Sequence, residues 1–335
     1  MGAPTVNRQI LLAETPKGKL EQSHFRLIES DAPVAGDGEL LVRTRLISLD
    51  AANRAWMQGA TYRSAVEADS VMAGGAIAEV IESRAPGFAP GDLIFADTGW
   101  QDYAAIPARA ATKMPKLEPM SHLLSVYGIA GLTAYFGLLR AGRLRDGETV
   151  AVSAAAGSVG SIAGQIARIK GCHVIGIAGG QEKCDWLVSE LGFNQAIDYK
   201  AGPIFKTLKA AAPHGIDVYF DNVGGDIFEA CLFNMKLYGR IACCGAVSQY
   251  DGAPSPHGPR GVPGLIVVKR LSLQGFIVTD YENEREQALA DLESWVASGQ
   301  LKVQEDILDG LENTPGALIG LLAGENRGKR MVRVA

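Results

Sequence analysis

The stretch Val150-Ala-Val-Ser-Ala-Ala-Ala-Gly-Ser-Val-Gly160 decides how this chain folds. It is a short apolar strand that runs through a small-residue turn into a helix, with Ile162, Ile166 and Ile169 at helical spacing. From Ala155 it reads Ala-x-Gly-x-x-Gly, the dinucleotide-binding pattern with alanine in place of its first glycine. We predict that Gly157 lets the backbone approach a pyrophosphate and that Gly160 permits close helix–strand packing.

The end of the next strand indicates which dinucleotide is bound. Residues 172–178 read as that strand, and Gly179 and Gly180 follow it where NAD-binding sites carry an acidic residue. Two glycines leave room for a 2′-phosphate, and Lys183 supplies a positive charge on the next helical turn. The sequence therefore favours NADPH over NADH.

Composition indicates a globular protein with about two domains. The chain has 335 residues, of which 47% are hydrophobic and 40 are glycine, as an α/β fold with many tight turns requires. A net charge of −5 argues against a nucleic-acid or membrane-surface partner. No apolar run is long enough to span a bilayer, so we expect a cytoplasmic protein.

The cysteines give no sign of a disulfide framework or a metal centre. All five lie between Cys172 and Cys244, and no Cys-x-x-Cys pair occurs among them. The five histidines are scattered, so they suggest no ligand set either. We expect buried, free cysteines and no metal site.

The pattern along the chain predicts two domains, the second inserted in the first. Residues 1–125 read as short strands with turns, including 39–48, 75–82 and 93–96. Strand–helix units then alternate, which predicts a doubly wound parallel sheet of five or six strands. The tail at 329–334 is strand-like again and is expected to rejoin the first domain. We therefore assign residues 1–125 plus 300–335 to a mostly antiparallel β catalytic domain, and 126–299 to a Rossmann domain.

Four further segments narrow the family. They are Gly131-Leu-Thr-Ala-Tyr-Phe-Gly-Leu138, Asp221-Asn-Val-Gly-Gly225, Cys244-Gly-Ala-Val-Ser-Gln-Tyr250 and Gly324-Glu-Asn-Arg-Gly-Lys-Arg-Met-Val-Arg-Val334. With the glycine motif they resemble a zinc-free group of the medium-chain dehydrogenase/reductase superfamily, which holds prostaglandin reductases, plant double-bond reductases and bacterial curcumin reductases. The group has a GroES-like catalytic domain and reduces the double bond of α,β-unsaturated carbonyls with NADPH. A homodimer is implied by the resemblance alone.

The resemblance also assigns cofactor contacts and shows one departure. Where the group tends to read Ser-Leu-Asp-Pro-Tyr-Met-Arg, this chain has Ser48-Leu-Asp-Ala-Ala-Asn-Arg54, so its substrate side differs more than its cofactor side. The implied cofactor contacts are Gly157, Ser158, Val159 and Gly160 at the pyrophosphate; Gly179, Lys183 and Tyr199 at the 2′-phosphate; and Thr133, Asn222, Cys244, Gly245, Ala246, Val247, Ser248, Phe276, Ile277, Val278 and Asn326 elsewhere.

Tyr250 is the candidate catalytic residue. Hydride addition to the β-carbon of an enone leaves an enolate, whose oxygen needs a hydrogen-bond donor and whose α-carbon needs a proton. A phenol is protonated at neutral pH. Tyr250 follows residues 239–244, which read as the fourth strand of the parallel sheet, so it lies at the sheet edge where ligands bind. The phenol either donates that proton or orients the substrate while water donates it.

The substrate side carries two weaker predictions. Asn53, Trp56 and Tyr62 are candidates to line a pocket for a flat apolar enone, although core packing explains Trp56 equally well. The Pro- and Gly-rich segment 251–264 is predicted to be a loop that closes over the nicotinamide. An NADPH quinone reductase like zeta-crystallin and a non-catalytic NADPH-binding protein are the alternative functions.

Overall fold

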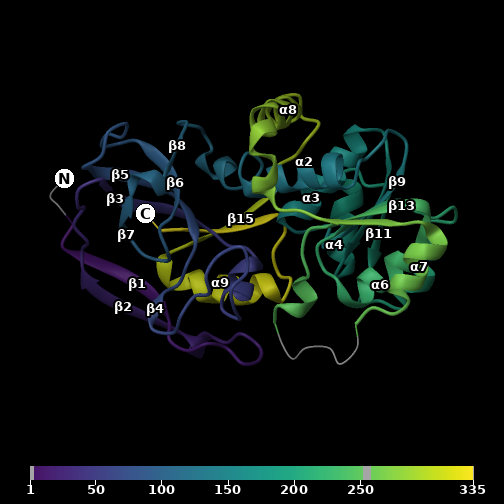
Figure 1. The fold of residues 1–335 in the computed structure, drawn as a ribbon, viewed down its shortest axis with the longest axis horizontal. Helices are drawn as coiled ribbons and strands as arrows, with labels where there is room; N and C mark the ends of the chain where they lie inside the picture. Colours follow the sequence, from purple (N-terminus) through teal and green to yellow (C-terminus); the bar gives the residue numbers. More distant parts are fainter. Residues whose placement is uncertain (1–3, 252–257, 335) are drawn as a thin grey trace.

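The computed structural model describes residues 4–251 and 258–334, which form two halves that lie side by side along the long axis of the molecule (Figure 1). One half holds a six-stranded parallel sheet, and the other holds the β-rich beginning of the chain together with its last strands. Strands β15 (Glu305–Asp309) and β16 (Lys329–Arg333), yellow in Figure 1, lead from the first of these halves back into the second.

The parallel sheet follows the doubly wound order predicted from the sequence. Its strands are ordered β11-β10-β9-β12-β13-β14, and every neighbouring pair is parallel. The chain crosses over beside β9, so the carboxyl ends of β9 and β12 flank the position where such sheets bind ligands. The bounds are β9 (Thr149–Ser153), β10 (His173–Ala178), β11 (Gln195–Asp198), β12 (Ile216–Asp221), β13 (Met235–Cys243) and β14 (Ser272–Gly275).

Helices cover both faces of this sheet because successive residues of a strand point to opposite sides. On β9, Val150 and Val152 belong to one buried cluster and Ala151 to the other. The first cluster includes residues of α2 (Ile129–Phe136), α3 (Ser158–Ile169), α4 (Gln181–Ser189) and α8 (Arg285–Ala297). The second includes residues of α5 (Ile204–Ala211) and α6 (Gly225–Asn234), with α7 (Val262–Lys269) packed against it.

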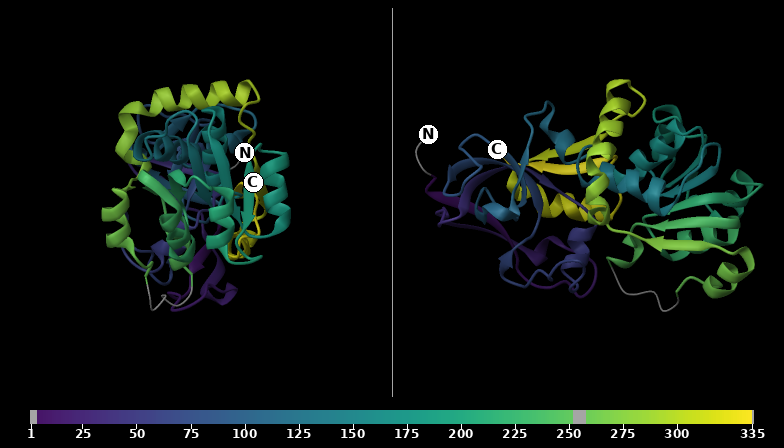
Figure 2. Two further views of the ribbon diagram at one scale, coloured as in Figure 1. Left: turned by 90° about the vertical axis from the view of Figure 1, so that its right-hand side faces the viewer. Right: turned by 45° about the horizontal axis from the view of Figure 1, so that its top comes forward.

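The other half is built on a mixed sheet in the order β15-β16-β3-β5-β6-β8, with β7 paired to β3. A smaller sheet, β2-β1-β4, packs beside it (Figure 2). The elements are β1 (Val6–Leu12), β2 (Phe25–Asp31), β3 (Glu39–Ser48), α1 (Ala52–Trp56), β4 (Ser70–Val71), β5 (Gly75–Ser83), β6 (Leu93–Asp97), β7 (Tyr103–Pro107), β8 (Thr112–Met114) and α9 (Thr314–Leu322). The tail strand β16 pairs antiparallel with β3 of the first domain, a partner that the sequence did not specify. The division at residues 125 and 300 stays a proposal.

One predicted loop is shorter than the sequence suggested. Helix α7 begins at Val262, so the prediction of a loop through Gly264 is wrong at its end. Pro263 lies in the first turn of the helix, where its missing N–H has no intrahelical acceptor to lose. The middle of the predicted lid, residues 252–257, lies outside the described residues, so the closing role stays a prediction.

Candidate active site

The turn between β9 and α3 is built as an anion site. Gly157 is the N-cap of α3 and has no side chain to occupy the free N–H groups of Ser158, Val159 and Gly160. A Cβ on Gly160 would lie 2.3 Å from the carbonyl oxygen of Ala154, so the packing there requires glycine. The Ser158 hydroxyl is buried with no hydrogen-bond partner among the described residues, as a bound phosphate or ribose would supply.

The C-terminal segment before β16 closes one side of this turn. The Gly328 N–H donates to the Ala156 carbonyl at 2.8 Å, and the Asn326 side chain donates to the Gly328 carbonyl at 2.8 Å. From α4, the Lys183 ammonium donates to the Asn326 carbonyl at 2.7 Å. Three predicted cofactor contacts from distant parts of the chain, at 157–160, 183 and 326, are thus brought together.

A cluster of cations surrounds Lys183. Burial, followed by the charges of Lys200 and Arg327, lowers the pKa of Lys183. Beside it, a Cβ on Gly179 would lie 3.1 Å from the Tyr199 hydroxyl and 2.9 Å from the Lys200 side chain. A dianionic phosphate placed here would relieve the repulsion among these cations. Open space lies beside Gly180, where an added Cβ would meet no atom within 4 Å, and not beside Gly179, where Lys200 and Tyr199 fill it.

The loops after β12 and β13 meet at the same sheet edge. The Asn222 side chain donates to the Ser153 carbonyl at 2.7 Å, which ties the end of β12 to the end of β9. The Val247 N–H donates to the Asn222 carbonyl at 3.2 Å, and the Ser248 hydroxyl donates to the Val223 carbonyl at 2.6 Å. The loop after β13 therefore lies beside Asn222. It holds the predicted contacts Cys244, Gly245, Ala246, Val247 and Ser248.

Asp221 organises these loops, a role that the sequence analysis missed. One of its carboxylate oxygens accepts hydrogen bonds from the Tyr219 hydroxyl at 2.6 Å, the Ser153 hydroxyl at 3.2 Å and two backbone N–H groups at 3.0 Å. Burial and the Asp221 charge raise the pKa of Cys244 to about 12, with a smaller effect from Cys243. Cys244 is thus held as a neutral thiol. All five cysteines are free; Cys172, Cys184 and Cys231 are buried as expected, but the expectation is wrong for Cys243 and Cys244, which are only partly buried because they line the hollow at this sheet edge.

Tyr250 stands at the far end of the same loop. Its hydroxyl accepts a hydrogen bond from the Ala246 N–H at 3.1 Å, so its own proton is left for another acceptor. It lines a hollow of about 370 Å³ together with Asp221, Cys244 and Gln249. Partial burial, with Asp50 and Tyr250 nearby, raises the pKa of Tyr62 on the opposite half of the molecule.

The remaining predicted cofactor contacts lie on α2 and in the segment directly after β14, which leads into residues 278–284 beside α2. Thr133 is half-buried on α2, and Phe276 stacks edge-on against Phe220 with ring centroids 6.3 Å apart. Val278 packs against the same apolar cluster, whereas Ile277 is exposed. Phe276 thus has a packing role in the core in addition to any contact with a cofactor.

The three predicted substrate residues have different surroundings. Asn53 is buried; its side-chain oxygen accepts from the Asp50 N–H at 2.8 Å, and its amide donates to the Ala73 carbonyl at 3.2 Å. Trp56 and Tyr62 meet edge to face with ring centroids 6.3 Å apart. These two rings present an aromatic surface, while both groups of the Asn53 amide are engaged within the fold.

An ion pair beneath this surface was left without a role in the sequence analysis. The Lys329 ammonium donates to Asp50 at 2.5 Å, and the Ser48 hydroxyl donates to the other Asp50 oxygen at 2.7 Å. Burial acts to raise the pKa of Asp50, but the Lys329 charge and the two hydrogen bonds outweigh it, so the pKa is lowered. The sequence did carry a signal for these two residues, because Asp50 lies in the motif Ser48–Arg54 and Lys329 in the motif Gly324–Val334.

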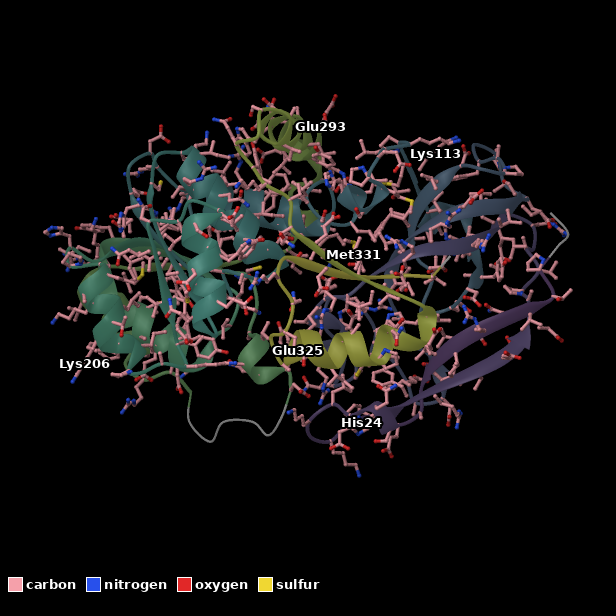
Figure 3. All side chains as sticks on the ribbon, turned by 180° about the vertical axis from the view of Figure 1, so that it is seen from behind. His24, Lys113, Lys206, Glu293, Glu325 and Met331 are labelled. Atoms are coloured by element: carbon pink, nitrogen blue, oxygen red, sulfur yellow. The ribbon has the colours of Figure 1, made fainter. Side chains whose placement is uncertain are left out.

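No metal centre is apparent in the described part of the chain. Within residues 4–251 and 258–334, no three His, Cys, Asp or Glu side chains are gathered as metal ligands would be. His24 lies at the outer edge of the β-rich half, far along the molecule from Lys206 (Figure 3). The zinc-free site expected from the sequence stays a prediction.

Comparisons with known proteins agree with this geometry. Residues 8–114 match the family described as N-terminal domain of oxidoreductase, and residues 158–294 match the zinc-binding dehydrogenase family. The NADPH-dependent curcumin reductase of Escherichia coli is 40% identical over 98% of this chain and 97% of its own. Prostaglandin reductase 1 of Bos taurus is 43% identical over 93% and 94%, and the 2-alkenal reductase of Nicotiana tabacum is 37% identical over 100% and 99%.

The chain belongs to the medium-chain dehydrogenase/reductase superfamily, in the group of these reductases. CurA from Vibrio vulnificus, solved in complex with NADPH, superimposes with a TM-score of 0.93 at 40% identity, covering 98% of this chain and 99% of that one. A quinone oxidoreductase of Escherichia coli superimposes at 0.76 with 22% identity, a likeness of fold alone. None of this reductase's helices in the described ranges combines the length and apolar character needed to cross a membrane.

Proposed function

We propose that this protein reduces the carbon–carbon double bond of α,β-unsaturated aldehydes and ketones with NADPH. The observation that carries the proposal is the convergence of the glycine turn, the Lys183 cluster and Tyr250 on one edge of the parallel sheet. This edge is the ligand-binding edge of a doubly wound fold. The relatives that share nearly the whole chain are named as reductases of curcumin, of prostaglandins and of 2-alkenals.

The residues at this edge fit an NADP cofactor. The α3 N-terminus and the orphaned Ser158 hydroxyl would hold the pyrophosphate. Lys183 and Tyr199 would hold the 2′-phosphate at the turn formed by Gly179 and Gly180, where space is open beside Gly180. The backbone of residues 244–248 would line the remainder.

The chain's own residues supply positioning and a proton. When bound, NADPH supplies the hydride that adds to the β-carbon of the substrate. The Tyr250 hydroxyl donates a hydrogen bond to the substrate carbonyl oxygen and stabilises the negative charge that develops there. The same phenol, or a water molecule that it orients, then delivers the proton to the α-carbon. Trp56 and Tyr62, whose rings meet edge to face, would contact the enone from the other half of the molecule.

The first experiment measures NADPH consumption with a conjugated enone and with a quinone of similar size. NMR identification of a saturated ketone supports the proposal, and Tyr250→Phe should then lower kcat by about 10²-fold, the usual contribution of a general acid. Turnover of the quinone with an untouched enone would place the protein with the quinone reductases. Tight NADPH binding without reduction of any activated alkene would indicate a non-catalytic protein.

We also propose that two copies associate through the edge strand β14. Apolar side chains are exposed beside this strand, and β14 has one free edge in the described structure. The exposed apolar side chains are those of Leu237, Tyr238, Val267, Val268 and Ile277. Sedimentation as a monomer at micromolar concentration would contradict this homodimer. The cytoplasmic location and the lack of a nucleic-acid partner stay predictions.

A further inference from the structure

The segment at Tyr250 and Asp251 is held by the opposite half of the molecule. The Gln58 side chain donates to the Tyr250 carbonyl at 3.0 Å. The Arg54 Nε donates to an Asp251 oxygen at 3.1 Å, and the Leu20 N–H donates to the same oxygen at 2.7 Å. All three donors come from the first part of the chain, and their acceptors belong to two consecutive residues of the nucleotide-binding half.

Arg54 makes this attachment a strong one. Its side chain is only 1% exposed, on the short helix α1. Its Nη2 donates to the Gly18 carbonyl at 2.7 Å, while Nη1 has no partner among the described residues. A buried guanidinium needs a carboxylate nearby, and Asp251 is the one with which it pairs. The pair therefore resists any displacement of Asp251.

The attachment bears directly on the Tyr250 side chain. Consecutive Cα atoms are separated by a fixed distance of about 3.8 Å, so fixing Asp251 fixes the Tyr250 backbone within a narrow range. On its other side, the phenol is held by the Ala246 N–H. Tyr250 is thus fixed by its own half through the hydroxyl and by the opposite half through the backbone.

We infer that Arg54 and Asp251 are positioning residues for Tyr250, so that the phenol is correctly placed only when the two halves are docked. The inference rests on the proposed function, in which Tyr250 serves the enolate oxygen. Proton donors act efficiently only within a few tenths of an ångström of the productive geometry. A weakened ion pair therefore acts on turnover through Tyr250.

The test is a double-mutant cycle between Asp251→Asn and Tyr250→Phe. Asparagine keeps an oxygen for the Leu20 N–H and removes the charge that Arg54 pairs with. We expect Asp251→Asn alone to lower kcat for the enone by about tenfold with the KM for NADPH unchanged. In the Tyr250→Phe background it should change kcat less than about twofold, because no hydroxyl is left to position. The inference would be overturned if Asp251→Asn lowered kcat by the same factor with Tyr250 and with Phe at position 250. It would also be overturned if Asp251→Asn left kcat unchanged in both proteins.

Two further variants separate positioning from loss of structure. Gln58 is exposed, so Gln58→Ala should leave folding intact and still lower kcat by about threefold, an effect that Tyr250→Phe abolishes. Glu148→Gln is the matched control, because Glu148 pairs with Arg240 and its side chain is 15% exposed, against 14% for Asp251. Glu148→Gln should leave kcat unchanged, and an equal fall there would indicate a general structural effect. If Tyr250→Phe itself leaves kcat unchanged, the proposed role of Tyr250 fails instead.

Discussion

Replacing Gly160 by alanine should damage both the folded state and the cofactor site. The new Cβ would lie 2.3 Å from the Ala154 carbonyl oxygen and 2.9 Å from Ala155 Cα. Both are backbone atoms, so no side chain can rotate away, and α3 must move by about 1.1 Å to lengthen the 2.3 Å contact to an ordinary 3.4 Å. Overpacking of this kind costs about 1–3 kcal/mol, and alanine returns about 0.5–1 kcal/mol in helix propensity.

We therefore expect the free energy of unfolding to fall by about 1–2 kcal/mol in urea titrations followed by tryptophan fluorescence. Because the displaced turn carries the N–H groups that face the pyrophosphate, the Kd for NADPH should rise by about tenfold or more, measured by fluorescence titration. Gly264 is the control: it lies on α7 with no atom within 4 Å of an added Cβ. Gly264→Ala should be neutral or slightly stabilising. The reasoning would be refuted if Gly160→Ala left both the Kd for NADPH and the urea concentration at the midpoint of unfolding unchanged.

Three other predictions follow from charges described above. Lys183→Ala should raise the KM for NADPH by about tenfold or more and leave the KM for NADH unchanged, and equal changes would remove Lys183 from the 2′-phosphate site. Asp50 has a lowered pKa in the folded state, so its contribution to stability is full above its ordinary value near 3.8 and is lost as pH falls through the lowered value. The stability of Asp50→Asn should therefore fall less than that of the unchanged protein as the pH is lowered through this range. The same dependence of stability on pH in both proteins would contradict the prediction. Because the pKa of Cys244 is raised to about 12 and that of Cys243 to about 11, both thiols should resist iodoacetamide at pH 8, and rapid labelling seen by peptide mass spectrometry would contradict these raised pKa values.

The parallel sheet could be predicted because its signals are local. Ile162 and Ile166 repeat at helical spacing on α3 and are both buried, and the glycine turn lies directly before them. The short helix α1 gave no comparable signal, since five residues do not complete a periodic pattern. Helix α7 was obscured by Pro263 and Gly264, which are read as loop residues unless the helix start is known.

The parts of the site that depend on distant pairs could not be predicted from the sequence. Lys329 meets Asp50 across 279 residues, and Asp251 meets Arg54 across 197. No spacing rule joins such positions, and one sequence offers only the separate motifs. Lys183 was predicted as a phosphate ligand from its place after two glycines, but its hydrogen bonds to the carbonyls of 324 and 326 depend on how the tail folds back.

The position of β16 has a consequence for the order in which the molecule can be made. This strand lies between β15 and β3, so an interior position of the mixed sheet is filled by a segment that leaves the ribosome long after β3. The same segment brings Gly328 against Ala156. A nascent chain can pair β3 with β5 and complete its parallel sheet while it is still being translated. The second wall of the dinucleotide site forms only after residue 328 has left the ribosome, so affinity for the nucleotide should arise later than the parallel sheet itself.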